Sequence, residues 1–215
     1  MKRFLLNLLD WIYKKKCYFC GNSKECVKMC SECYSKLERL PLKVNRIING
    51  KKVYCAGVYE KELQKLIRGL KYHNQPELAY YLAKFMAEYW REITDDKDLQ
   101  VVPVPIYAKR KKQRKYNHME LVGEEFAKLL EIEYNPDLIV RIKDTKPQYN
   151  LKKNQRAENL QGAFSVDKTK LKKGKILIID DICTTGSTFE EMIKELQKGG
   201  FDDIVCFTAT TPFGE

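Results

Sequence analysis

The feature that most constrains the fold is the apolar run at residues 175–180 (KILIID), which ends in two adjacent acids, Asp180 and Asp181. A short run this apolar, bounded by polar residues, is typical of a strand buried on both faces of a parallel sheet. Hydroxyl residues and Gly186 follow the acids at once. A buried strand needs none of this polarity, so the sequence predicts a ligand at the carboxyl end of this strand.

Apolar strands and amphipathic helices alternate along the second half of the chain. The strands are expected at 101–105, 138–142, 163–166, 175–180 and 203–210, and the helices between them at 118–131 and 187–200. Upstream, a hairpin with its turn at Asn49-Gly50 and helices at 60–72 and 76–90 are expected. This order predicts an α/β fold with a doubly wound, mainly parallel sheet.

Five cysteines lie within residues 17–33 of the 215-residue chain. Cys17 with Cys20, and Cys30 with Cys33, form two C-x-x-C pairs, the spacing that brings four thiolates onto one zinc ion. Cys26 is a spare cysteine in this interpretation, and free thiols are the alternative. We expect residues 1–42 to form a small zinc-binding module, stabilised by a structural zinc, and residues 43–215 to form the main domain.

The first thirteen residues (MKRFLLNLLDWIY) have apolar side chains at helical spacing. We expect an amphipathic helix that docks on its own chain, with membrane contact as the less favoured alternative. Neither a secretory signal nor a run long enough to span a membrane is found, so we expect a cytoplasmic protein with reduced cysteines.

The formal net charge is +11, and residues 109–115 (KRKKQRK) hold six basic residues and no acid. A basic chain of this size is expected to meet polyanions such as nucleic acid, phosphates or pyrophosphate. A solvated surface is the plain alternative, although it accounts poorly for so dense a block. Residues 143–162 form a polar stretch without clear periodicity, which predicts a long functional loop.

The residues after Asp181 have the chemistry of a phosphate cradle. Hydroxyl donors, a glycine that permits close backbone approach and the start of a helix suit a phosphate, while two carboxylates suit vicinal hydroxyls. The order resembles the signature of type I phosphoribosyltransferases, D-D-x-x-T-T-G-x-T after an apolar strand, which binds phosphoribosyl pyrophosphate (PRPP). The resemblance implies that Asp180 and Asp181 contact the ribose hydroxyls. It implies that the remaining PRPP-binding residues are Cys183, Thr184, Thr185, Gly186, Ser187 and Thr188.

Two further elements of that family find counterparts here. A pyrophosphate loop is expected after the strand at 101–105, where Arg110, Arg114 and Lys115 would take a catalytic role by pairing with pyrophosphate oxygens. A closing loop is expected at residues 143–162. Its matching positions are Gln148, Arg156 and Asn159.

The four cysteines, together with the segments PVP, RKYNH, KPQYNL, RAEN and GAF, resemble the ComF family of competence proteins over nearly the whole chain. That family usually has R-G-F-N-Q where this chain has RKYNH. The resemblance implies a type I phosphoribosyltransferase fold and a role in natural transformation, with single-stranded DNA and proteins of the DNA-uptake machinery as partners. It implies Mg²⁺-dependent phosphoribosyl transfer, with pyrophosphate release, to an acceptor that the sequence does not name. The alternatives are a DNA-binding competence factor and a PRPP sensor without turnover.

Overall fold

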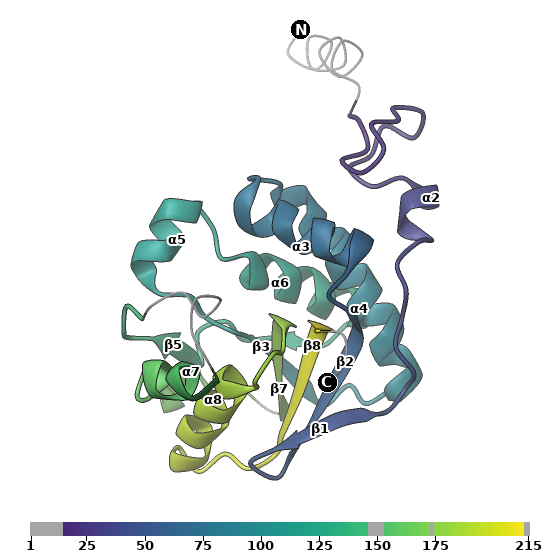
Figure 1. Ribbon diagram of the computed structural model, residues 1–215. Helices are drawn as coiled ribbons and strands as arrows, with labels where there is room; N and C mark the ends of the chain where they lie inside the picture. Colours follow the sequence, from purple (N-terminus) through teal and green to yellow (C-terminus); the bar gives the residue numbers. More distant parts are fainter. Residues whose placement is uncertain (1–14, 146–152, 173, 213–215) are drawn as a thin grey trace, which may run out of the picture.

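The computed structural model describes residues 15–145, 153–172 and 174–212, and its centre is a six-stranded sheet (Figure 1). The strand order is β1-β2-β8-β7-β3-β4; within this sheet β1 and β2 pair antiparallel and every other neighbouring pair is parallel. The strands are β1 (Val44–Ile48), β2 (Lys51–Val58), β3 (Leu99–Pro103), β4 (Glu133–Tyr134), β7 (Lys175–Ile182) and β8 (Ile204–Thr211). The predicted α/β fold with a mainly parallel sheet is confirmed.

Helices cover both faces of this sheet (Figure 1). α3, α4 and α6 pack on one face, and α8 packs on the other. The helices are α2 (Ser31–Tyr34), α3 (Lys61–Tyr72), α4 (Ala79–Ile93), α5 (Ala108–Arg114), α6 (His118–Leu130), α7 (Lys153–Leu160) and α8 (Ser187–Lys198), with short 3₁₀ turns at Pro76–Leu78 and Lys168–Lys170. The two-sided cover explains why the central strands are apolar along their whole length.

β7 divides its side chains between two hydrophobic cores. Leu177 and Ile179 are fully buried with α3, α4 and α6, whereas Ile176 and Ile178 are buried with α8. Successive side chains of a strand point to opposite faces, so this alternation continues into the polar end of β7.

The turn of the β1–β2 hairpin lies at Asn49-Gly50, as predicted. Asn49 and Gly50 have φ angles of 47° and 75°. Two consecutive positive φ angles are the requirement of a type I′ turn, which Asn-Gly supplies. The hairpin extends the sheet beyond β8 and places β1 at its edge.

Three predictions about the polar half of the chain were wrong. The strands expected at 138–142 and 163–166 do not join the main sheet: β5 (Ile139–Arg141) and β6 (Phe164–Val166) pair antiparallel as a separate ribbon. The stretch at 143–162 is not all loop, because α7 occupies its second part. The basic block at 109–115 is largely the short helix α5. None of these elements shows the apolar periodicity of a core element; in α5, no residue is buried.

The cysteine segment lies at one end of the molecule, beside α3 and α4 (Figure 1). Tyr34 donates a hydrogen bond from its hydroxyl to Glu88 Oε2 (2.9 Å), and Arg39 pairs with Glu92 (2.7 Å). Cys17, Cys30 and Cys33 belong to the same buried cluster as α3 and α4. The segment therefore packs against the main domain, and the boundary expected between residues 42 and 43 stays a prediction.

Within the described parts of the chain, no helix is both long and apolar enough to cross a membrane. The amphipathic helix expected over the first thirteen residues lies outside the described residues.

Candidate functional site

The two acids at the end of β7 face different parts of the molecule. Asp181 follows Ile179 in the alternation and points to the face covered by α3 and α6. Asp180 points to the opposite face, and its Oδ1 accepts a hydrogen bond from the Asp181 backbone N–H (2.8 Å). Asp181 is buried and Asp180 is half-buried. The pair is therefore divided by the pleat of the strand.

Asp181 is held by two side chains from the helices above it. The Lys71 ammonium of α3 lies 2.6 Å from Asp181 Oδ2, and His118 Nε2, at the start of α6, donates to the same oxygen. His118 Nδ1 is buried without a hydrogen-bond partner among the described residues. Three elements that are distant in sequence thus meet at one carboxylate.

The charges of this cluster follow from burial and contact. Burial would raise the pKa of Asp181, but the Lys71 charge, the imidazole and their hydrogen bonds hold that pKa well below its usual range. Burial lowers the pKa of His118, and Asp181 offsets this only in part. A neutral imidazole leaves Lys71 as the counter-charge of Asp181, while His118 supplies a hydrogen bond.

Asp180 has the opposite electrostatic character. Burial is the largest cause that raises the pKa of Asp180, and the neighbouring charge of Asp181 raises that pKa further. Lys71 and Arg141 of β5 act in the other direction, toward the ionised form. Two adjacent carboxyl groups whose pKa values move apart are a mark of functional sites.

The hydroxyl-rich turn that follows β7 is clamped by two arginines. Arg46 of β1 donates from Nη1 to the Thr184 carbonyl oxygen (2.7 Å), and Arg156 of α7 donates from Nη1 to Thr184 Oγ1 (2.7 Å). Cys183 donates its backbone N–H to the Thr210 carbonyl oxygen (2.9 Å), which ties the start of the turn to β8. Two guanidinium groups therefore flank the predicted phosphate cradle.

The turn ends at Gly186, directly before α8. Gly186 has φ = 84°, and a Cβ built there would lie 2.4 Å from Ile48 Cδ1 of β1. Thr185 Oγ1 and Ser187 Oγ lie 2.9 Å apart. Ser187 begins α8, and Thr188 follows it within the first turn. The first backbone N–H groups of a helix lack intrahelical partners and attract anions, so the hydroxyl groups and the helix start together have the chemistry to bind an anion, and the phosphate role of these residues stays a prediction.

The residues expected at pyrophosphate spread in two directions from α5. Arg110 donates from Nη2 to the Thr145 carbonyl oxygen (2.5 Å). The Arg114 guanidinium lies 5.5 Å from the ring centroid of Tyr72, at the end of α3. Lys115 ends the helix with φ = 71°, at the position where this family usually has glycine. Arg110 and Arg114 therefore contact different parts of the molecule, and the pyrophosphate role of the three cations stays a prediction.

The residues expected in the closing loop have separate outcomes. Gln148 lies outside the described residues. Arg156 and Asn159 are on α7, which packs against α8, and Arg156 reaches the cradle at Thr184. The closing role of these residues stays a prediction.

The four predicted zinc ligands come together. The Sγ atoms of Cys17, Cys20, Cys30 and Cys33 all lie within 4.8 Å of one another, with 3.7 Å between Cys20 and Cys30. Sulfurs around a tetrahedral zinc are about 3.8 Å apart, as the Zn–S distance of ~2.3 Å requires. Backbone hydrogen bonds lower the pKa of Cys17 to about 6 although burial opposes them. Cys26 is exposed and outside the cluster. This cluster can hold a metal such as zinc.

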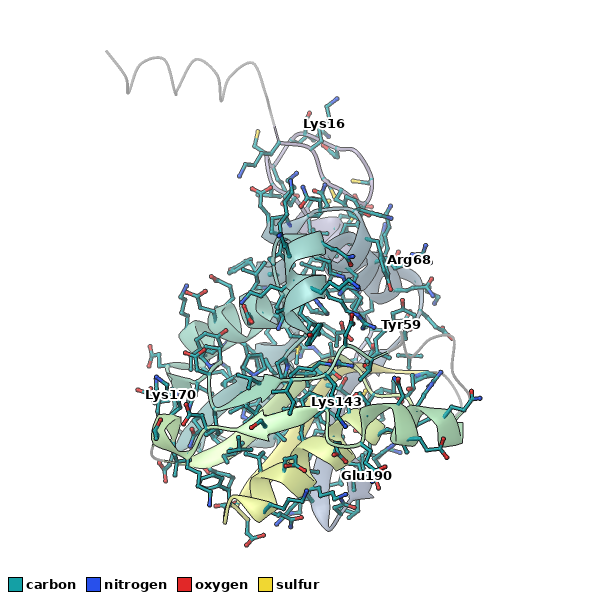
Figure 2. The ribbon with its side chains drawn as sticks, turned by 90° about the vertical axis from the view of Figure 1, so that its left-hand side faces the viewer. Lys16, Tyr59, Arg68, Lys143, Lys170 and Glu190 are labelled. Carbon is teal, nitrogen blue, oxygen red and sulfur yellow. The ribbon has the colours of Figure 1, made fainter. Side chains whose placement is uncertain are left out.

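The cysteine segment rests on α3. Tyr18, next to Cys17, contacts His73 Nδ1 through its hydroxyl (2.5 Å), and a Cβ at Gly69 would lie 3.2 Å from the Tyr18 ring. Lys65 donates to the Phe19 carbonyl oxygen (2.9 Å). Figure 2 labels Arg68, on the same helix, between Lys16 at the cysteine segment and Tyr59.

Sequence reasoning missed two residues of this site. Arg46 lies on an edge hairpin that nothing in the sequence connects to the cradle 138 positions later. Lys71 lies on a helix expected from its apolar spacing, and nothing in the sequence indicates its buried contact with Asp181.

No protein-family model matches the chain. A protein from Haemophilus influenzae named "Competence protein F" is 28% identical over 198 residues, which are 87% of this chain and 86% of that protein. That competence protein is therefore a homologue of the chain. "DNA utilization protein YhgH" of Salmonella typhimurium is 25% identical, and the match covers 86% of this chain and 85% of that protein. "Competence protein ComFC" of Bacillus subtilis is 22% identical, and the match covers 89% of this chain and 76% of that protein.

The solved structures similar to the chain include a phosphoribosyltransferase. The adenine phosphoribosyltransferase from Leishmania donovani aligns over 81% of this chain and 86% of its own, with 12% identity and a TM-score of 0.39.

Proposed function

We propose that this chain is a PRPP-binding, phosphoribosyltransferase-like protein that acts in natural transformation. One observation carries the proposal: Thr184 is held between the guanidinium groups of Arg46 and Arg156 at the start of α8, directly after the acid pair at the end of β7. Guanidinium groups, hydroxyl groups and a helix N-terminus recognise a phosphate, and a neighbouring carboxyl group recognises sugar hydroxyls.

The proposed reaction is transfer of the phosphoribosyl group to a nitrogen nucleophile. The bond between the anomeric carbon and pyrophosphate breaks, and its electron pair leaves with the pyrophosphate. The acceptor nitrogen forms the new bond to that carbon and loses its proton. Mg²⁺ bound with PRPP would supply charge neutralisation on the pyrophosphate oxygens.

The cations of α5 are proposed to act on the leaving group. Arg110, Arg114 and Lys115 would stabilise the negative charge that grows on pyrophosphate. Their present contacts with Thr145 and Tyr72 would be exchanged for the ligand, with α7 and its loop excluding water from the reacting carbon.

A zinc ion is proposed as the structural metal of the cysteine segment. The convergence of four sulfurs supports it, as do the burial of Cys17, Cys30 and Cys33 and the spare position of Cys26. Four thiolates make a closed site, which suits a structural ion rather than a catalytic one.

The role in natural transformation is proposed from the relatives, two of which are named competence proteins and one a DNA utilization protein. Single-stranded DNA and proteins of the DNA-uptake machinery are the partners this role implies.

The test measures PRPP binding by calorimetry, and pyrophosphate release with Mg²⁺ across a panel of nitrogenous acceptors. The variant Asp180→Ala/Asp181→Ala removes the acid pair of the site. The matched control, Asp202→Ala/Asp203→Ala, removes another adjacent acid pair, just before β8. We expect binding and release to be lost in the first variant and kept in the second. Binding that persists unchanged without Asp180 and Asp181 would reject the assignment.

A second function, binding of single-stranded DNA, is favoured by one observation. Tyr72 is 57% exposed, and Arg114 of the basic helix α5 stands over its ring. An exposed aromatic ring among cations is suited to base stacking and phosphate pairing. DNA affinity that depends on salt and survives Asp180→Ala would identify a separate DNA site. Direct competition between PRPP and DNA would identify a shared one. PRPP binding without turnover on any acceptor would favour the sensor alternative.

A further inference from the structure

The two acids at the end of β7 differ in their partners, their burial and the direction of their pKa shifts. Asp181 has two partners on one carboxylate oxygen, Lys71 and His118, and its side chain is 6% exposed. Asp180 has neither partner and is half-buried. A ligand at the turn after β7 therefore meets two chemically different carboxyl groups.

The direction of each acid is fixed by the strand. Asp181 points to the α3–α6 face, away from α8, whose first turn forms the cradle. Asp180 points to the face that α8 covers, where Arg141 of the β5–β6 ribbon influences it. Asp180 is thus the acid on the same side as the cradle.

We propose that Lys71 and His118 are positioning residues that hold Asp181 inside the protein, so that Asp180 is the carboxyl group that meets the bound ribose. This inference rests on the proposed function, because it divides roles within the PRPP site. It differs from the family resemblance, which gives both acids to the ribose hydroxyls.

The energetics favour this division. Freeing Asp181 for a ligand would break a buried ion pair and leave the Lys71 ammonium, 16% exposed at its side chain, without its counter-charge. Stranding a buried charge in this way is strongly unfavourable. Among the residues that the structure describes, Asp180 has no such pair to lose, and its raised pKa makes it ready to share a proton with a hydroxyl group.

The first experiment is a double-mutant cycle on PRPP affinity, measured by calorimetry with Mg²⁺ on the full chain with its metal. Asp180→Ala should weaken binding about tenfold, since it removes the direct hydrogen bond between this carboxyl group and the ribose. Lys71→Met and Asp181→Asn should each weaken binding, and the double variant should be no weaker than the worse single one. Lys84→Met, which removes an ammonium paired with Glu88 (2.7 Å) on α4, is the matched control and should not change affinity.

The second experiment measures the titration of His118, which lies beside Lys71 at Asp181, and it does not need PRPP. The chain has two histidines, so the ring signals of His118 are assigned in nitrogen-15 NMR spectra by comparison with a His73→Asn variant. In the wild type, His118 should stay neutral with its proton on Nε2. Because the Lys71 charge lowers the pKa of His118, Lys71→Met should raise that pKa and make the imidazole the cation beside Asp181. A purely structural role for Lys71 would not shift this titration.

Each result is decisive. If Asp181→Asn still costs affinity in the Lys71→Met background, Asp181 touches the ligand and the inference is overturned. An unchanged His118 titration in Lys71→Met overturns it as well. A wild-type chain that binds no PRPP, with the His118 response intact, overturns the proposed function and the ligand role of Asp180, but supports the positioning of Asp181.

Discussion

Gly186 provides a stringent test of how closely β1 approaches the cradle. We predict that Gly186→Ala destabilises the chain through two separate terms. The first is backbone strain, because an alanine at φ = 84° sits in the left-handed region, which costs about 1–2 kcal/mol. The second is a steric clash, because the new Cβ would lie 2.4 Å from Ile48 Cδ1. Overpacking of this kind costs about 1–3 kcal/mol, which gives a total of roughly 2–5 kcal/mol.

Two further variants separate these terms. Ile48→Val removes Cδ1 and leaves Cγ1, at 3.4 Å from the new Cβ, so the cost of Gly186→Ala in that background should fall by about 1–3 kcal/mol. Gly200→Ala is the control for strain alone, since Gly200 has φ = 89° and nothing lies within 4 Å of a Cβ built there.

The assay is urea unfolding, followed by far-UV circular dichroism at neutral pH, of five chains: the wild type, Gly186→Ala, Ile48→Val, the double variant and Gly200→Ala. The reasoning is refuted if Gly186→Ala costs the same with and without Ile48 Cδ1, because the clash would then be absent. If Gly186→Ala costs no more free energy of unfolding than Gly200→Ala, the clash is likewise absent. PRPP affinity measured on the same variants shows whether the displaced turn still holds a phosphate.

Three other predictions concern charge, metal and docking. The pKa of Asp180 is raised in the folded chain, so the folded chain keeps a proton there that the unfolded chain releases near pH 4. The free energy of unfolding should therefore decrease as pH rises from about 4 through the raised pKa. Asp180→Asn should make this decrease smaller. Asp181→Asn should instead remove stability that is present above about pH 4, because the folded pKa of Asp181 is lowered; identical pH profiles for the two variants would contradict both assignments. Metal analysis of the reduced, purified chain should find zinc, and chelation should lower the unfolding midpoint, whereas a chain without zinc would reject the zinc proposal. Tyr34→Phe should cost about 1 kcal/mol in thermal unfolding by removing the hydrogen bond to Glu88, and a cost near zero would show that this contact does not hold the cysteine segment.

The sequence was most informative where one local pattern determines one structure. The apolar run at 175–180 became the central strand β7, and Asn49-Gly50 became the hairpin turn. The two C-x-x-C pairs identified the four converging sulfurs and left Cys26 aside. Each of these features depends on residues close together in the chain.

The sequence was least informative where partners are distant or surfaces are polar. The ribbon of β5 and β6 pairs segments separated by the whole polar stretch, and each strand buries a single residue, Ile139 or Phe164, which is too little to predict the pairing. Helix α7 buries Leu160 but shows little apolar periodicity. The contact of Lys71 with Asp181 depends on how α3 packs on the sheet, which no short-range pattern encodes. The sequence could have predicted that Asp180 and Asp181 point to opposite faces of the sheet, since adjacent residues of a strand do so.

The contact of the cysteine segment with α3 links two sites that are far apart in the sequence, the four-cysteine cluster and the acid pair of β7. Tyr18 contacts α3 at Gly69 and at His73 just beyond its end, and Lys71 lies between these two positions. The turn of α3 that carries Lys71, the counter-charge of Asp181, is therefore supported from outside by Tyr18, the neighbour of the proposed metal ligand Cys17. Coupling between two binding sites is reciprocal. If the metal stabilises this turn and so strengthens ligand binding, bound ligand must strengthen metal binding by the same free energy, and the ligand affinity of the chain then reports its metal content.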